Sequence, residues 1–220
     1  MILIFKKILF RIIIFKRFFL NQNKEFFFWK KTYSFTKKFI KLNKNLKIGL
    51  EVGVAAGSHI DSILKNTSVK KMYGVDPYLF YERNDEKPLI KDLMLFFKIY
   101  SITKESKKKI FNSFFELAKK KLSKYGRRVE LIRKSSKAAA EEFKNRTLDF
   151  VFIDANHSFK NCYQDIQLWY PKIKMGGYLM GHDYNMDYFP GVVRAVNKSF
   201  KRERISVDLK SEVWFVKKIN

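Results

Sequence analysis

Short apolar runs alternate along this chain with segments that have helical spacing. Seven runs rich in β-branched and aromatic residues predict strands at 46–54, 70–76, 129–134, 148–155, 176–183, 205–209 and 212–218. Five stretches between them predict helices at 58–66, 86–124, 136–144, 158–170 and 191–202. Alternating strands and helices are typical of an α/β fold, with a mostly parallel sheet covered by helices on both faces. The last two strands predict an antiparallel hairpin at one edge, because only a tight turn at Lys210–Ser211 separates them.

The first 45 residues differ from the rest, and we expect a basic, apolar, helical N-terminal extension (1–45) before a single domain at 46–220. Residues 1–47 hold 13 Lys and Arg but only one acidic residue, Glu25. Charges interrupt the apolar stretches too often for a transmembrane helix, which needs about 20 apolar residues. We therefore expect a cytoplasmic protein whose residues 1–22 contact an anionic membrane surface peripherally. Docking of this segment on its own domain is the alternative.

The whole chain is strongly basic, with 46 Lys and Arg against 21 Asp and Glu and a net charge of +25. Such a charge favours a polyanionic neighbour, either an acidic membrane or a nucleic acid. Compositional drift in an AT-rich genome explains it equally well, because Lys, Phe, Ile and Asn are all abundant. The single cysteine, Cys162, excludes a disulfide framework and a multi-thiolate zinc site.

Polar residues of the kinds that bind ligands or take part in catalysis follow several predicted strands. In open α/β sheets, ligands bind beyond the carboxyl ends of the strands. The loops at those ends are 51–58, 76–78, 134–137, 154–157 and 182–185. All three histidines, at positions 59, 157 and 182, lie in or beside these loops. This clustering predicts a functional site at the carboxyl edge of the sheet.

The loop after the first strand has the pattern E-x-G-x-x-x-G, from Glu51 to Gly57. Small residues let the backbone approach a ligand, and the helix that follows presents free N–H groups. The pattern is not the dinucleotide fingerprint G-x-G-x-x-G. A carboxylate at Glu51 suits a ligand that carries an ammonium or sulfonium group. Asp76, at the end of the second strand, is placed to accept ribose hydroxyls.

With these motifs the sequence resembles the class I S-adenosylmethionine-dependent methyltransferases, and among them the small-molecule and sugar O-methyltransferases (a Methyltransferase-24-like group). The resemblance covers residues 46–202, and its fold is a Rossmann-like sheet of seven strands. Its motifs are GLEVGVAAGS (49–58), GVDPY (74–78), LIRKSSKAA (131–139), LDFVFIDANHSFKNCYQDIQLWYPKIKMGG (148–177) and GHDYN (181–185). The fourth motif is the most specific, because it joins F-I-D-x-x-H to D-I-x-x-W and K-x-G-G.

The resemblance implies that S-adenosylmethionine is the cofactor. It assigns the methionine end of the cofactor to the first loop, the ribose to Asp76, and the adenine to Ser135 and Ser136. Many relatives carry an acid at the position of Ser135. The implied cofactor-binding residues are Glu51, Gly53, Ala55, Gly57, Ser58, Asp76, Ser135 and Ser136.

A hydroxyl acceptor must lose its proton to a general base or to a metal ion. In similar metal-dependent sugar methyltransferases, the residue matching Asp154 binds Mg²⁺ and the residue matching His157 is the base. The other ligands there form an acidic pair, for which this chain has His182 and Asp183. Imidazole suits Zn, Fe or Ni better than Mg²⁺. We therefore expect Asp154 and His157 to be catalytic, and Asp154, His182 and Asp183 to hold a divalent metal, Mg²⁺ or another.

These residues predict a methyltransferase that modifies a hydroxyl of a small molecule or a glycan. One alternative is an RNA methyltransferase that binds through the basic surface, although the Lys run at 104–121 is more typical of a solvated helix face. Another alternative is a non-catalytic, membrane-associated protein that binds an adenosyl ligand. Carboxylates and imidazoles at strand ends favour catalysis.

Overall fold

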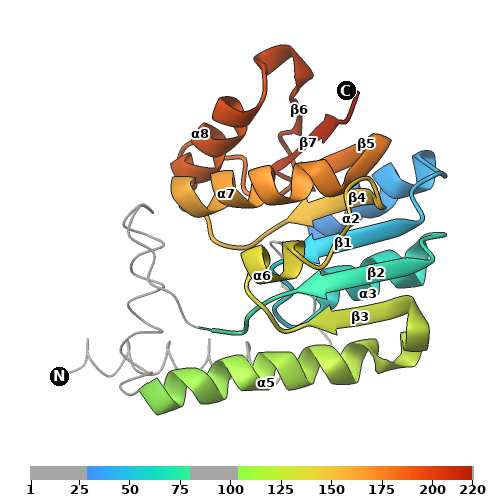
Figure 1. The fold of residues 1–220 in the computed structure, drawn as a ribbon, viewed down its shortest axis with the longest axis vertical. Helices are drawn as coiled ribbons and strands as arrows, with labels where there is room; N and C mark the ends of the chain where they lie inside the picture. Colours follow the sequence, from blue (N-terminus) through green and yellow to red (C-terminus); the bar gives the residue numbers. More distant parts are fainter. Residues whose placement is uncertain (1–28, 80–103, 220) are drawn as a thin grey trace, which may run out of the picture.

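The structure is a computed structural model, and it describes residues 29–79 and 104–219. A seven-stranded sheet with the order β3-β2-β1-β4-β5-β7-β6 forms its centre (Figure 1). The strands are β1 (Ile48–Val52), β2 (Lys71–Val75), β3 (Val129–Ile132), β4 (Leu148–Ile153), β5 (Ile173–Gly181), β6 (Ser206–Asp208) and β7 (Val213–Lys217). Strands β1 to β5 pair in parallel, and β7 runs antiparallel to both β5 and β6. The predicted Rossmann-like sheet with an antiparallel C-terminal hairpin is therefore confirmed.

Helices cover both faces of the sheet, which is also confirmed (Figure 1). Buried apolar residues of α6 (Ser136–Ala140), α7 (Phe159–Trp169) and α8 (Pro190–Ser199) pack on one face. Those of α2 (Trp29–Leu42), α3 (Ser58–Asn66) and α5 (Lys104–Leu122) pack on the other. The 3₁₀ segments are η1 (Ser123–Arg128), η2 (Tyr170–Lys172) and η3 (Arg202–Arg204).

Several element boundaries differ from the prediction for local physical reasons. Strand β1 ends at Val52, because Gly53 has φ +91° and a Cβ there would lie 1.9 Å from the carbonyl oxygen of Asp154. Strand β5 begins at Ile173, earlier than predicted, and accommodates a register shift against β4. Helix α6 ends at Ala140, four residues before the predicted end. The predicted helix 86–124 matches α5 from Lys104 onward, and residues 86–103 lie outside the described residues.

Helix α2, from the predicted extension, packs against the central sheet. Phe39 contacts Tyr178 edge-on at 4.9 Å between ring centroids and lies at the same distance from Phe215. Ile40 is fully buried. Residues 29–42 therefore cover one face of the sheet, whereas the predicted membrane segment 1–22 lies outside the described residues. Within 29–79 and 104–219, no helix combines the length and apolar character that crossing a membrane requires.

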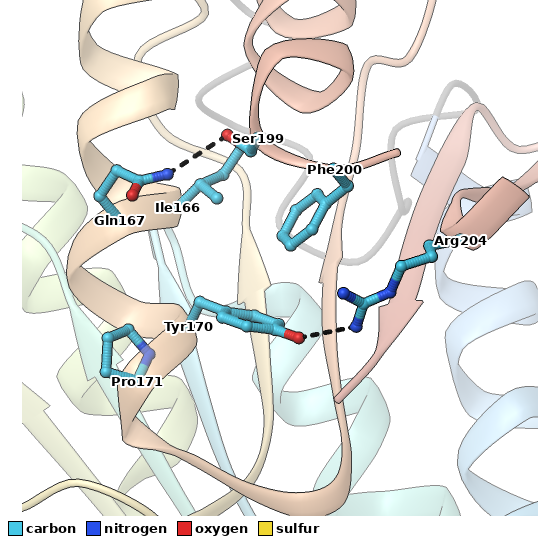
Figure 2. A pocket seen from close by; sticks show the side chains of 7 residues that line it. All are labelled: Ile166, Gln167, Tyr170, Pro171, Ser199, Phe200 and Arg204. Atoms are coloured by element: carbon cyan, nitrogen blue, oxygen red, sulfur yellow. Dashed lines mark hydrogen bonds between the residues drawn. The ribbon is translucent and has the colours of Figure 1, made fainter. Parts of the chain in front are cut away.

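A small pocket of about 170 Å³ lies beside the last turn of α7 (Figure 2). Arg204 donates a hydrogen bond from Nη2 to the Tyr170 hydroxyl at 3.0 Å across one wall. Because this pocket is at the opposite end of α7 from His157, it is separate from the predicted site. The lining residues are Ile166, Gln167, Tyr170, Pro171, Ser199, Phe200 and Arg204.

Candidate functional site

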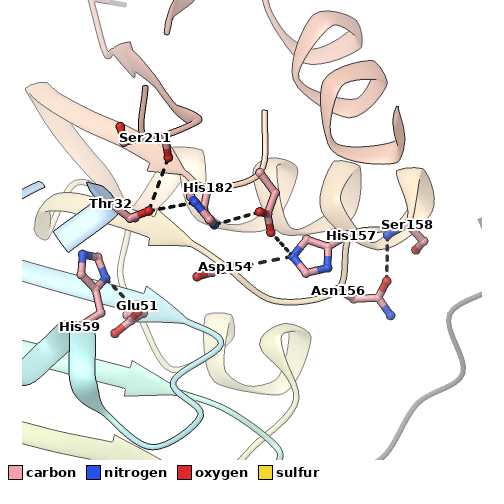
Figure 3. Close-up of polar contacts among 10 residues, drawn as sticks. Thr32, Glu51, His59, Asp154, Asn156, His157, Ser158, His182 and Ser211 are labelled. Atoms are coloured by element: carbon pink, nitrogen blue, oxygen red, sulfur yellow. Dashed lines mark hydrogen bonds and ion pairs between the residues drawn. The ribbon is translucent and has the colours of Figure 1, made fainter. Parts of the chain in front are cut away.

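The predicted site residues lie at the carboxyl edge of the sheet, and Figure 3 shows Glu51, Asp154, His157 and His182 there. Parallel strands bring their carboxyl ends to the same edge of the sheet, so loops that are far apart in sequence become neighbours. Glu51 and Asp76 come from one side of this edge. Asp154, His157 and His182 come from the strands beside them.

Glu51 lies near the end of β1 and is only 2% exposed. Its Oε1 lies 3.0 Å from Nδ1 of His59, in the first turn of α3. Its Oε2 has no hydrogen-bond partner within the described part of the chain. Burial raises the pKa of Glu51, and the neighbouring His59 opposes this shift. A buried carboxylate oxygen without a donor fits a cationic ligand group such as the ammonium of an amino acid.

Asp76 ties the first loop to the end of β2. Its Oδ2 accepts the backbone N–H groups of Val54 and Ala55 at 3.0 and 3.1 Å, and its Oδ1 accepts that of Tyr78 at 2.7 Å. Burial raises the pKa of Asp76, and these three hydrogen bonds oppose the shift. A carboxylate has about four lone-pair positions. The backbone thus leaves about one position on Asp76 for the predicted ribose contact.

The remaining predicted cofactor residues border the same region from α3 and α6. Ala55 is exposed in the first loop, and Gly57 is the N-cap of α3 with φ +74°. The hydroxyl of Ser58 accepts from Lys121 Nζ at 2.5 Å. Ser135 caps α6 by accepting the N–H of Ala138 at 3.3 Å.

Ser136 makes its hydrogen bonds on the core side of α6. Its hydroxyl accepts from Trp169 Nε1 at 2.8 Å and also bonds the buried carboxyl group of Asp165. These contacts give Ser136 a structural partner on α7. Its predicted contact with adenine stays a prediction.

Two histidines flank one buried carboxylate at the ends of β4 and β5. Nε2 of His157 lies 2.6 Å from Oδ2 of Asp183, and Nδ1 of His182 lies 2.9 Å from Oδ1 of the same residue. Nε2 of His157 is also 3.7 Å from Oδ1 of Asp154. In Figure 3, Asp154, His157 and His182 point toward one another from the two strand ends.

The electrostatics of this cluster follow from its burial and its mixed charges. Burial opposes ionisation of Asp183, but His157 and His182 hold its pKa well below the usual range. Burial would lower the pKa of His182, but Asp183 and Asp154 raise it to about 9. Asp183 also has φ +61°, a strained conformation for a residue other than glycine. Backbone strain of this kind is concentrated at functional sites.

Three of these residues offer a donor set for a metal ion. One ligand atom each from Asp154, His182 and Asp183 lies within 4.8 Å of the others. Two carboxylates and one imidazole suit a divalent cation. The residues that the sequence singled out as metal ligands are therefore brought together, and their side chains fit such an ion.

Two contacts that hold site residues in place were not predicted from the sequence. Thr32 of α2 has its Oγ1 2.9 Å from Nε2 of His182, although 150 residues separate them in the chain. Tyr33, the next residue, stacks on His59 with 5.1 Å between ring centroids. Charge and composition set α2 apart as an extension, and no local signal links it to the strand ends.

Comparison of the sequence with known proteins finds a matching family model and a similar viral protein. A family model described as a methyltransferase domain matches residues 47–184, more than half of the chain. An uncharacterized protein of Acanthamoeba polyphaga mimivirus is 26% identical over 158 residues. The match covers 68% of this chain and 57% of the viral protein's own length.

Solved structures share the fold at low sequence identity. The O-methyltransferase NovP is 16% identical with a TM-score of 0.63, over 86% of this chain and 80% of NovP. An O-methyltransferase from Bacillus cereus in complex with SAH is 15% identical with a TM-score of 0.54, over 86% and 81% of the two chains. A SAM-dependent O-methyltransferase from Thermotoga maritima is 14% identical with a TM-score of 0.56, over 91% and 69%. Because the family model described as a methyltransferase domain matches more than half of the chain, the chain belongs to that methyltransferase family.

Proposed function

We propose that the protein transfers a methyl group from S-adenosylmethionine to a hydroxyl group of a small-molecule or glycan acceptor. The observation that carries this proposal is the convergence of Asp154, His157, His182 and Asp183 near Glu51 at the end of β1. Membership of a methyltransferase family indicates that the reaction is methyl transfer. A hydroxyl acceptor must lose its proton, and the imidazole and carboxylate groups are suited to remove it.

The loop after β1 and its partners bind the cofactor in this proposal. When bound, S-adenosylmethionine supplies a methyl group already activated on a sulfonium. The free oxygen of Glu51 receives the ammonium group, and the Asp76 carboxylate keeps the loop at Val54 and Ala55 in place. Fixed placement of the two reactants can lower the barrier by about 7–11 kcal/mol.

His157 is the general base of the proposed reaction. Its Nε2 pairs with Asp183, so the ring takes the proton of the acceptor hydroxyl on its other nitrogen, Nδ1. Asp183, at 2.6 Å, holds the ring in place and stabilises the imidazolium that forms. His157 is 9% exposed as a residue, and its ring packs on Phe189, which keeps bulk water away from it.

Asp154, His182 and Asp183 hold the divalent metal of the proposed site. A metal ion there supplies Lewis acidity, which lowers the pKa of the acceptor hydroxyl. His157 lies beside these three residues without being one of the ligands, so it remains available to accept the proton.

The cofactor assignment is tested by isothermal titration calorimetry on the purified full chain. We expect S-adenosylmethionine to bind in the micromolar range, at roughly −8 kcal/mol. Glu51→Gln should weaken this binding about 10- to 100-fold, because a charge-assisted hydrogen bond contributes about 1.5–3 kcal/mol. Methylthioadenosine lacks the amino-acid end of the cofactor and should bind equally to both proteins.

Glu130→Gln is the matched control, because Glu130 is an exposed carboxylate that pairs with Lys71 away from the site. This variant should bind S-adenosylmethionine with wild-type affinity. Absence of binding to the well-folded wild type would overturn the proposed function. Equal weakening of both ligands by Glu51→Gln would remove Glu51 from the ammonium site.

A further inference from the structure

A hydrogen bond from outside the matched methyltransferase region reaches the candidate metal site. Thr32 of α2 is 1% exposed, and its Oγ1 lies 2.9 Å from Nε2 of His182. The family match begins at residue 47, so α2 is not part of the region that identifies the chain. Thr32, His182 and Ser211 are seen together in Figure 3.

Thr32 has a second hydrogen-bond partner, the backbone carbonyl of Ser211. Its hydroxyl donates to the backbone carbonyl of Ser211 at 3.4 Å, and a carbonyl can only accept. A threonine hydroxyl has one proton, and when this proton is donated to Ser211, Oγ1 can accept the N–H at Nε2 of His182. A metal bound at Nδ1 would leave the one proton of the neutral imidazole on Nε2, the nitrogen that faces Thr32. Nδ1 is the nitrogen that faces Asp183, at 2.9 Å.

Helix α2 holds Thr32 in this position through its other contacts. The hydroxyl of Thr36, one turn later, donates to the carbonyl of Thr32 at 2.9 Å and is fully buried. Phe39 packs on Tyr178 and Phe215. Because these contacts fix the helix against the sheet, the Thr32 hydroxyl is a preorganised partner for the histidine.

We infer that Thr32 is a positioning residue that presents Nδ1 of His182 to a metal, and that the resulting donor set selects a first-row transition-metal ion over Mg²⁺. The inference rests on the proposed function, because the metal is the one assigned to that site. Metal-binding histidines generally donate their second N–H to an acceptor that fixes the ring and its tautomer. One nitrogen with the carboxylates of Asp154 and Asp183 suits such an ion, whereas Mg²⁺ prefers oxygen ligands.

The test measures metal affinity, without turnover, on the full chain produced without a histidine tag. Co²⁺ and Mg²⁺ are titrated separately and followed by calorimetry, and Co²⁺ also by its visible absorption. We expect the wild type to bind Co²⁺ at least tenfold more tightly than Mg²⁺. Thr32→Val should weaken Co²⁺ binding about 10- to 100-fold. Thr32→Ser should keep it near the wild-type value, because serine retains the hydroxyl.

Thr36→Val is the matched control, because it removes a buried threonine hydroxyl that, within the described part of the chain, bonds a carbonyl of the same helix and no site residue. It should leave Co²⁺ affinity unchanged. A second variant, His182→Asp, should reverse the preference toward Mg²⁺, and this measurement decides the metal choice even if Thr32→Val does not fold. Wild-type Co²⁺ affinity in folded Thr32→Val, or equal affinity of the wild type for the two metals, would overturn the inference. Either result leaves the proposed function standing if S-adenosylmethionine binds; failure of that binding is the separate sign that the function is wrong.

Discussion

Asp183 shows how one residue can organise two others. Its two carboxylate oxygens face different histidines, at 2.6 Å for His157 and 2.9 Å for His182. The left-handed backbone conformation at φ +61° turns its side chain into the cluster directly after β5. A single buried carboxylate thereby orients the proposed base on one side and a proposed metal ligand on the other.

The proposed base can be tested at the residue scale by His157→Ala. For an acceptor that the wild type methylates, the variant should have a kcat about 10²- to 10⁴-fold lower, because proton transfer contributes that much. Its affinity for S-adenosylmethionine should be unchanged, since Glu51 and Asp76 are intact. The loss should be smaller for a phenol than for an aliphatic alcohol, because a phenolic hydroxyl needs less help with deprotonation. Full activity of the variant would instead make His182 the next candidate base.

At the element scale, α6 and α7 are joined by a polar contact inside an apolar interface. Asp165 of α7 is 6% exposed and bonds the hydroxyl of Ser136, which also accepts from Trp169. Burial raises the pKa of this carboxyl group to about 6, and the Ser136 hydrogen bond opposes the shift. The folded protein therefore holds the Asp165 proton to a higher pH than the unfolded chain does. The contribution of Asp165 to stability is present at low pH and is lost as pH rises from about 4 to about 6.

Asp165→Asn removes this titration while keeping a polar partner for Ser136. We expect the variant to be about 1–3 kcal/mol more stable than the wild type at pH 7.5, with a difference that shrinks toward pH 4. Urea unfolding at several pH values measures it. Glu116→Gln, which changes an exposed carboxylate on α5, should show no such pH-dependent difference. A constant difference at all pH values would mean that the carboxyl group of Asp165 does not titrate in this window.

Helices and strands could be predicted from the sequence where the local residues determine their ends. The predicted helix 58–66 coincides with α3, because Gly57 ends the preceding turn and the apolar spacing is regular. The convergence of Glu51, Asp154 and His182 was also predictable, since parallel strands bring their ends together; that these residues form the active site stays a prediction. The contacts from Thr32 to His182 and from Tyr33 to His59 were not, because they depend on how α2 docks. A basic, Phe-rich composition does not encode that docking angle.

At the scale of the whole molecule, the chain extends beyond the family match at 47–184 on both sides. The segments before and after the match meet at the site. Helix α2 supplies Thr32, and the turn before β7 supplies the carbonyl of Ser211. The aromatic contacts of Phe35 and Phe39 with Phe215 join the same two segments. The segments before and after the family match therefore pack on each other, and Thr32 also contacts His182.

Truncations separate the role of α2 from that of the residues before it. A chain lacking residues 1–45 loses the buried side chain of Ile40 and the partly buried side chain of Phe39, and a fully buried apolar side chain contributes about 1.5–3 kcal/mol. Such a loss is a large share of the 5–15 kcal/mol that typically stabilises a domain. We expect this truncation to unfold at clearly lower urea concentration, whereas a chain lacking only residues 1–22 keeps α2 and should bind S-adenosylmethionine like the wild type.

The shorter truncation also tests the proposed membrane contact, because residues 1–22 contain five Lys and Arg among Phe, Ile and Leu. Each cation near an anionic surface contributes about 1 kcal/mol, so the full chain should sediment with vesicles that contain phosphatidylserine. Neutral phosphatidylcholine vesicles and raised salt should both reduce this binding, since the attraction is electrostatic. Removal of residues 1–22 should reduce it at least tenfold. Unchanged sedimentation of a folded truncation would place the attraction on the rest of the basic surface, and an aggregated truncation would show instead that this segment covers the core of its own domain.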